Sequence, residues 1–323
     1  MSLTTPRSAP RATPDSADPA SRPSKVTFDS LREAKRSGRA IAAMTAYDFP
    51  TARVVDEAGI DMVLVGDSLG MAVLGYDDTL AVTLDEMIHH ARAVRRGVQR
   101  ALLVVDMPFG SFHVSDEETV RNAIRVVKES GAEAVKIEGA RISRLEAVSA
   151  AEIPVVGHLG LTPQSVHKMG GYKVQGRTHG AIERLLQDAL ALERAGAVAL
   201  VLEGIPREVA ARITASLDIP TIGIGAGPDC DGQILVFHDV FQLTFAPAAK
   251  FVRRFGDAAA LFREGLEQYK AAVLDRSFPA DGESYHLPAA MRDPSRTVPL
   301  DPEPLSLEDA SLEQEAVAAA GAR

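Results

Sequence analysis

Polar and ionisable side chains stand where several short apolar runs of this sequence end. The runs lie in LVGDSLG, LVVDMPF, VKIEGA, VVGHLG and LVLEGIP, and the polar residues at their ends are Asp67, Ser68, Asp106, Lys136, Glu138, His158 and Glu203. If the runs are parallel strands of one barrel, these side chains meet at its carboxyl-terminal end, where barrel enzymes hold their active sites.

Three of the acids, Asp67, Asp106 and Glu138, belong to consecutive runs. Taken singly, each is explained as well by a helix cap or a turn hydrogen bond. Together they form a self-repelling cluster unless a cation neutralises it. Oxygen ligands favour Mg²⁺, whereas zinc would call for a His and Cys set that the isolated His158 and Cys230 do not supply. The spacing therefore predicts a magnesium site.

Lys136 and Glu138 are two residues apart in one run. Along an extended strand, residues at this spacing project to the same face. The side chains of Lys136 and Glu138 therefore either both point into the barrel end or both point away from it.

The elements that must position these residues alternate along the chain. The predicted strands are Ala40–Tyr47, Asp61–Val65, Ala101–Val105, Ala134–Ile137, Ile153–Gly157, Ala197–Leu202, Ile219–Ile224 and Gln233–Phe237. Segments with helical spacing follow them, with Gly131 and Gly196 where helices should end. This pattern predicts a single-domain (β/α)₈ TIM barrel. The rival is an open doubly wound sheet, which would carry a glycine-rich fingerprint where MTAYDFPTARVV stands.

Composition predicts the boundaries of the domain and limits the kinds of partner that the protein can bind. A net charge of −9 leaves no basic field for nucleic acid. The one cysteine cannot form an intrachain disulfide and no apolar stretch of about 18 residues occurs, so we expect a cytoplasmic protein without a membrane span. Residues 1–24 and the acidic, Pro- and Ala-rich tail 288–323 offer little to bury, which predicts disordered extensions around a barrel domain at 25–287.

Three further features have weaker signals. The segment LTPQSVHKMGGYKVQGRTHG is longer and more polar than a connecting helix needs, which makes it a candidate lid over the barrel. GIGAG at 223–227 lacks the lysine of a phosphate-binding loop, and a tight turn explains it at least as well. Cys230 has no chemistry assigned to it.

In order along the chain, the motifs resemble one family, ketopantoate hydroxymethyltransferase, also called 3-methyl-2-oxobutanoate hydroxymethyltransferase. The segments that carry the resemblance are TAYD at 45–48, VGDSLGM at 65–71, VVDMPF at 104–109, VKIEG at 135–139, GHLGLTPQSV at 157–166, GGYKVQGR at 170–177, LVLEGIP at 200–206 and IGIGAG with DGQILV at 222–236. They span almost the whole predicted barrel.

The resemblance implies Mg²⁺, 5,10-methylenetetrahydrofolate as the one-carbon donor and 3-methyl-2-oxobutanoate as the acceptor in pantothenate and coenzyme A biosynthesis. It also implies a homo-oligomer, a homodecamer. By motif, Asp67, Asp106 and Glu138 resemble the metal ligands and Glu203 resembles the catalytic base. The substrate contacts that the motifs imply are Asp67, Ser68, Asp106, Lys136 and His158. The departures are small: Gly204 follows the base, and Cys230 lies in a variable loop.

The expected reaction transfers a hydroxymethyl group to give 2-dehydropantoate through a Mg²⁺-stabilised enolate. One alternative is a Mg²⁺-dependent lyase or mutase of the phosphoenolpyruvate mutase and isocitrate lyase type. The other is a non-catalytic 2-oxo acid sensor, which would be expected to lose some of the acids. All of them are present.

Overall fold

The computed structural model describes residues 24–245 and 247–288 of the chain. They belong to two compact units, one that extends to Leu261 and one that begins at Phe262. The predicted extensions at 1–24 and 288–323 lie outside the described residues, apart from Ser24 and Pro288.

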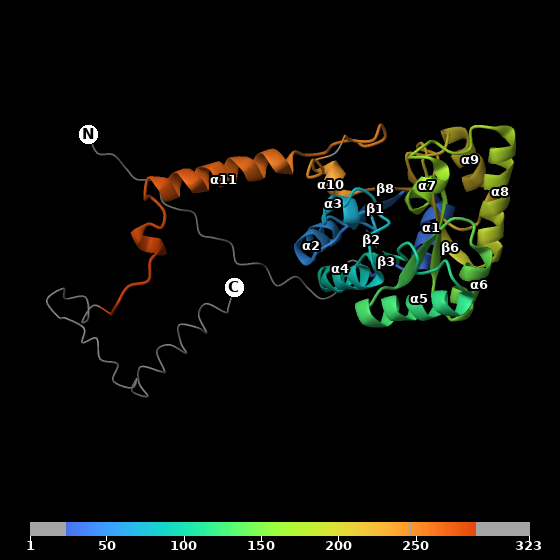
Figure 1. The fold of residues 1–323 in the computed structure, drawn as a ribbon, viewed down its shortest axis with the longest axis horizontal. Coiled ribbons are helices and arrows are strands. Elements are labelled where there is room, and N and C mark those ends of the chain that lie inside the picture. The colour runs from blue at the N-terminus through green and yellow to red at the C-terminus, as the bar shows by residue number, and fades with distance from the viewer. Residues whose placement is uncertain (1–23, 246, 289–323) are drawn as a thin grey trace, which may run out of the picture. The chain divides into compact units, whose positions relative to one another are not determined.

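Eight parallel strands close into a barrel in chain order, and the last strand pairs with the first (Figure 1). The strands are β1 Ile41–Thr45, β2 Met62–Val65, β3 Leu102–Asp106, β4 Ala134–Glu138, β5 Val155–Gly160, β6 Ala197–Glu203, β7 Thr221–Ile224 and β8 Gly232–Leu235. Each overlaps its predicted run. The (β/α)₈ barrel is therefore confirmed, and the open doubly wound sheet is excluded.

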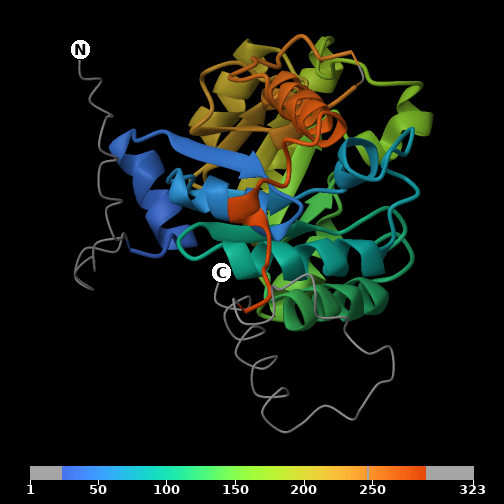
Figure 2. The same ribbon diagram turned by 90° about the vertical axis from the view of Figure 1, so that its left-hand side faces the viewer.

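Helices separate most of the strands along the chain. They are α1 Phe28–Ser37, α2 Phe49–Glu57, α3 Leu69–Ala72, α4 Leu84–Gly97, α5 Asp116–Ser130, α6 Ile142–Ala150, α7 Val166–Met169, α8 His179–Arg194, α9 Arg207–Ser216, α10 Phe237–Val240 and α11 Ala258–Leu274, with the 3₁₀ turns η2 Pro163–Ser165 and η3 Asp281–Glu283. At the start of α5, Ser115 accepts a hydrogen bond from the backbone of Glu118, and Gly131 ends the helix at a φ of 76°. Helices α4 and α5 pack together outside the strands (Figure 2).

Side chains alternate between the barrel interior and the surrounding helices. In β2, Met62 and Leu64 belong to the interior cluster, whereas Val63 and Val65 belong to the cluster packed against the helices. Helix α1 closes the amino-terminal end of the barrel, because Leu31 is buried in the interior cluster. The barrel is thus packed with apolar residues from its floor upward, which leaves its carboxyl-terminal end, here called the mouth, for polar groups.

The connection between β7 and β8 differs from the prediction, which expected a helical segment after each strand. Only the stretch 225–231 joins these parallel strands, and it contains no helix. It is too short for a helical crossover. Gly225 and Gly227 adopt φ values of 61° and 83°, so the GIGAG segment forms the tight turn that its glycines permit.

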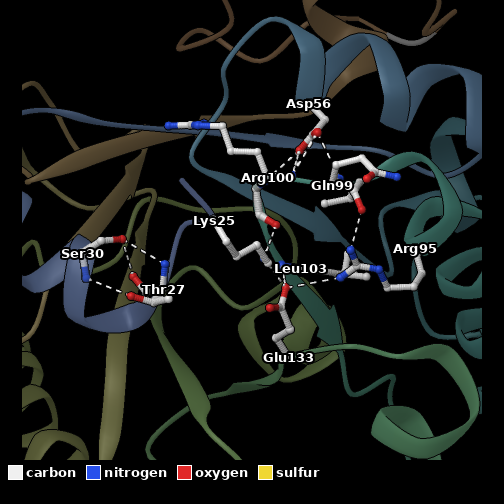
Figure 3. A network of polar contacts seen from close by, with 11 residues as sticks. Lys25, Thr27, Ser30, Asp56, Arg95, Gln99, Arg100, Leu103 and Glu133 are labelled. Carbon is white, nitrogen blue, oxygen red and sulfur yellow. Dashed lines mark hydrogen bonds and ion pairs between the residues drawn. The ribbon is translucent and has the colours of Figure 1, made fainter. Parts of the chain in front are cut away.

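A polar network lies at the amino-terminal ends of the strands (Figure 3). Asp56, at the end of α2, is buried, and its carboxylate accepts hydrogen bonds from three successive backbone N–H groups. The donors are Gln99 at 3.0 Å, Arg100 at 3.0 Å and Ala101 at 2.7 Å. Asp56 therefore fixes the turn that leads into β3.

We expect Asp56→Ala to lower the free energy of unfolding by about 3 kcal/mol, because it leaves backbone donors unpaired. Urea unfolding followed by circular dichroism measures the change. Glu57→Ala, which removes an exposed i,i+4 ion pair with Arg53 on the same helix, should cost at most about 0.5 kcal/mol. Equal losses in the two variants would contradict this role of Asp56.

The second unit begins within α11. No residue of this helix is buried, and Phe262, Leu266, Tyr269 and Val273 are exposed at spacings that place them on one helical face. Among the described residues, no helix combines the length and the apolar character needed to cross a membrane.

Candidate active site

The predicted site residues lie at the carboxyl-terminal ends of the strands, in positions whose side chains face the barrel interior. Leu102 and Val104 of β3 point into the interior cluster, and Asp106 continues their alternation. Ala134 of β4 is likewise interior and is followed at the same parity by Lys136 and Glu138. As expected from their spacing, Lys136 and Glu138 enter the mouth together, since their charged atoms lie 3.9 Å apart.

The same rule places the residues of the next two strands. Val156 of β5 and Val201 of β6 are interior, and His158 and Glu203 follow them at the same parity. The prediction ended the fifth strand at Gly157, but β5 continues to Gly160 because it pairs with the whole of β6 up to Glu203. His158 therefore lies within the strand and is buried, and it does not belong to a loop.

Contacts link these side chains into one chain across neighbouring strands. Lys136 Nζ lies 2.8 Å from Asp106 Oδ1 and 3.1 Å from His158 Nδ1. His158 Nδ1 lies 3.5 Å from Glu138 Oε1, and His158 Nε2 lies 3.2 Å from Glu203 Oε2. Glu203 is the most accessible of these side chains, with 14% exposed. Among the acids linked by these contacts, Glu203 is therefore the one that faces the solvent side of the mouth.

Asp67 and Ser68 join the cluster from the turn after β2. The backbone N–H of Asp67 donates to Asp106 Oδ2 at 3.1 Å. Gly66 makes room for this arrangement, since a Cβ atom there would lie 2.8 Å from Ser68 Oγ and 3.3 Å from Asp106 Oδ2. All of the predicted site residues are therefore brought together at the mouth.

Two further residues hold the cluster and were not predicted. The Gln164 side chain donates to Asp67 Oδ2 at 2.9 Å, and its backbone N–H donates to Glu138 Oε2 at 3.1 Å. The Tyr47 hydroxyl is hydrogen-bonded to Ser68 Oγ at 2.8 Å. Tyr47 is the last residue of the first predicted strand, so the rule that selected Ser68 and the acids would have found it had it been applied to that strand. No comparable signal marked Gln164, which lies in a 3₁₀ turn after β5.

Burial and charge shift the titration of these groups. Burial raises the pKa of Asp67 well above its ordinary value, and the charges of Asp106 and Glu138 add to the rise. Burial also raises the pKa of Asp106, although the Lys136 ammonium opposes this. Burial and Lys136 would lower the pKa of His158, but contacts with Glu138 and Glu203 outweigh them and raise it to about 9. Burial and neighbouring negative charge therefore oppose ionisation at Asp67 and Asp106, and a bound cation would favour it.

The donor set fits a hard cation held partly by non-protein ligands. Four carboxyl groups, those of Asp67, Asp106, Glu138 and Glu203, face only two basic side chains. Asp106 Oδ1 is buried and accepts no hydrogen bond of good geometry. Within the described ranges, no three His, Cys, Asp or Glu side chains are arranged to hold a metal ion by themselves. Mg²⁺ suits such a site, because it commonly binds one or two carboxylates and completes its shell with water or substrate.

Known proteins resemble this chain over the same region. The model of the family described as ketopantoate hydroxymethyltransferase matches residues 25–281. A 3-methyl-2-oxobutanoate hydroxymethyltransferase of Koribacter versatilis is 62% identical over 267 residues, which cover 82% of this chain and 90% of that protein. The enzyme of the same name from Pelobacter propionicus is 53% identical over 264 residues, covering 81% of this chain and 98% of its own length.

Solved structures share the fold at low sequence identity. A 2,3-dimethylmalate lyase, a member of the PEP mutase/isocitrate lyase superfamily, is 20% identical with a TM-score of 0.53, covering 93% of this chain and 100% of its own. A phosphonopyruvate hydrolase in complex with oxalate and Mg²⁺ is 16% identical with a TM-score of 0.52, covering 92% and 99%. These structures support the barrel, whereas the family match and the identities above 50% decide the relationship. This chain belongs to the ketopantoate hydroxymethyltransferase family.

Proposed function

We propose that this enzyme transfers a hydroxymethyl group from 5,10-methylenetetrahydrofolate to 3-methyl-2-oxobutanoate, giving 2-dehydropantoate. The observation that carries the proposal is the continuous cluster from Asp67 to Glu203, held at the mouth of a barrel that belongs to this family. Such a cluster combines a cation site, a fixed ammonium and a more accessible carboxylate. These are the groups needed to acidify a carbon next to a keto group.

Asp67 and Asp106 would hold Mg²⁺, with Glu138 as the third acid behind them. Glu138 is fixed from other sides by Gln164, Lys136 and His158, which suits a supporting position. When bound, the cation would bind the 2-oxo acid and withdraw electron density from its keto group.

The protein's own side chains supply the remaining steps. Ser68, oriented by Tyr47, would donate a hydrogen bond to the substrate carboxylate. The Lys136 ammonium would face the negative charge that develops on the keto oxygen, and His158 would hold Glu203 in place. Glu203 would remove the C3 proton of 3-methyl-2-oxobutanoate. Water would cleave both bonds from the methylene carbon to the folate nitrogens, releasing tetrahydrofolate and a formaldehyde-level carbon. The carbanion equivalent would add to that carbonyl carbon, and its oxygen, once protonated, would become the hydroxyl group of the product.

Incubation of the protein with Mg²⁺, 5,10-methylenetetrahydrofolate and 3-methyl-2-oxobutanoate tests this function. We expect ketopantoate to accumulate, as measured by mass spectrometry, and we expect none when the folate is left out. Turnover of a 2-oxo acid without folate would instead support a lyase or mutase. Binding of the 2-oxo acid without any turnover would support a sensor.

We further propose a homo-oligomer located in the cytoplasm. The exposed apolar face of α11, formed by Phe262, Leu266, Tyr269 and Val273, supports association with other copies, because such a stripe is unfavourable in water. The specific number, a decamer, rests on the family resemblance.

A further inference from the structure

A short segment crosses the mouth of the barrel above the acids. We call it the strap and define it as Tyr172–Gln175, within the predicted lid after β5. At one end, the Tyr172 hydroxyl contacts Met71 Sδ of α3 at 3.9 Å. At the other end, the Gln175 backbone N–H donates to the carbonyl of Gly204 at 2.9 Å. Since α3 follows β2 and Gly204 follows β6, the strap joins opposite sides of the eight-stranded ring.

The strap exposes an aromatic ring beside the catalytic acids. Tyr172 is 50% exposed, and its partner Met71 is also exposed. Partial burial raises the pKa of Tyr172, and the charges of Asp78, Asp67 and Glu203 raise it further. The contacts of the strap with residues that follow β2 and β6 place the ring over the mouth, and half of the ring remains open to a ligand. Val174 extends this apolar surface along the strap.

The surrounding segment is basic in an acidic protein. Between Leu161 and Ile182 the sequence contains no Asp or Glu, although the whole chain has a net charge of −9. Lys168, Lys173 and Arg177 are exposed there, and none makes an ion pair with any described residue. Unpaired cations beside an exposed ring are complementary to a flat aromatic ligand that carries an anionic tail.

We propose that the strap is the folate-binding platform, with the pteridine ring against Tyr172 and the glutamyl carboxylates near Lys173 and Arg177. This inference rests on the proposed function, which supplies the folate. It assigns the two substrates to different levels of the mouth. The small 2-oxo acid lies at the acids, and the large donor lies against the strap, where its one-carbon unit can be directed down toward Glu203.

Tyr172→Ala tests the ring contact. We expect the KM for 5,10-methylenetetrahydrofolate to rise about tenfold, as the loss of one aromatic stacking partner predicts. Tyr172→Phe keeps the ring and should keep the KM within about twofold of the wild type. The KM for 3-methyl-2-oxobutanoate and the folate-independent exchange of its C3 hydrogen in deuterium oxide should be unchanged in both variants.

Phe109→Ala is the matched control. Phe109 is similarly exposed but packs against His113 on the loop after β3, with ring centroids 4.8 Å apart. An unchanged folate KM in Tyr172→Ala, or an equal rise in Phe109→Ala, would overturn the platform while wild-type turnover still upheld the proposed function. Absence of folate-dependent turnover in the wild type would instead remove the proposed function itself.

Replacing Lys173 and Arg177 together tests the tail contact. Wild-type protein should have a lower KM for the triglutamate form of the donor than for the monoglutamate form, and added salt should reduce this preference. In Lys173→Ala/Arg177→Ala we expect the preference to fall about fivefold. Lys128→Ala, an exposed lysine near the end of α5, should retain it. A preference that survives the double substitution would refute the placement of the tail.

Discussion

Glu203→Gln is expected to slow the exchange of the C3 hydrogen of 3-methyl-2-oxobutanoate in deuterium oxide by about a thousandfold, the scale of a lost general base. The amide keeps the shape of the side chain and its approach to His158 Nε2, which lies 3.2 Å from Glu203 Oε2. It cannot accept the proton. Proton NMR of the substrate with wild-type protein and Mg²⁺ measures the exchange without any folate.

The matched control is Glu208→Gln, which makes the same change at an exposed glutamate in the first turn of α9. We expect this variant to exchange at the wild-type rate. Binding of the 2-oxo acid, measured by calorimetry in the presence of Mg²⁺, should survive in both variants. If Glu203→Gln exchanges as fast as the wild type, another group removes the proton.

Asp67→Ala and Asp106→Ala should both abolish Mg²⁺ binding in a calorimetric titration, but they should differ in stability. Asp106 lies 2.8 Å from the buried Lys136 ammonium. Removal of Asp106 therefore leaves this buried positive charge without its nearest counter-charge. We expect Asp106→Ala to lower the free energy of unfolding by about 3–5 kcal/mol. Asp67 has no ion-pair partner among the described side chains, and the negative charge of Asp106 opposes its ionisation.

Asp67→Ala should therefore retain the wild-type stability to within about 1 kcal/mol. Urea unfolding in the presence of a chelator compares the three proteins without metal. Wild-type Mg²⁺ affinity in both variants would refute the metal site. Equal stability of the two variants would show that Asp106 does not stabilise the buried charge of Lys136.

The sequence predicted the strands and most of the site because both depend on one local rule. Inward-facing residues alternate along a strand, so Asp106, Lys136, Glu138 and Glu203 could be placed at the mouth from their positions at strand ends. The partners of these residues depend on the closed barrel instead. The sequence predicted that the acids form a cluster whose negative charge a bound metal ion neutralises. The structure shows that Lys136 neutralises part of it, because β4 pairs Lys136 with Asp106 of β3.

Other features were beyond local rules. Gln164 reaches Asp67 from a turn nearly 100 residues further along the chain, and such a contact depends on how the loops fold over the barrel. The connection after β7 was expected to be helical because the preceding units are. Its brevity was visible in the sequence, and the glycines that allow the tight turn were there as well.

Helix α1 closes the amino-terminal end of the barrel, and this has a kinetic consequence. Because the floor is closed by Leu31 and its apolar neighbours, substrates and product have to pass through the same opening. A donor lying against the strap would then obstruct the path to the acids below it. Binding in the proposed arrangement is therefore sequential: the 2-oxo acid arrives first, the folate second, and spent tetrahydrofolate departs before ketopantoate can leave.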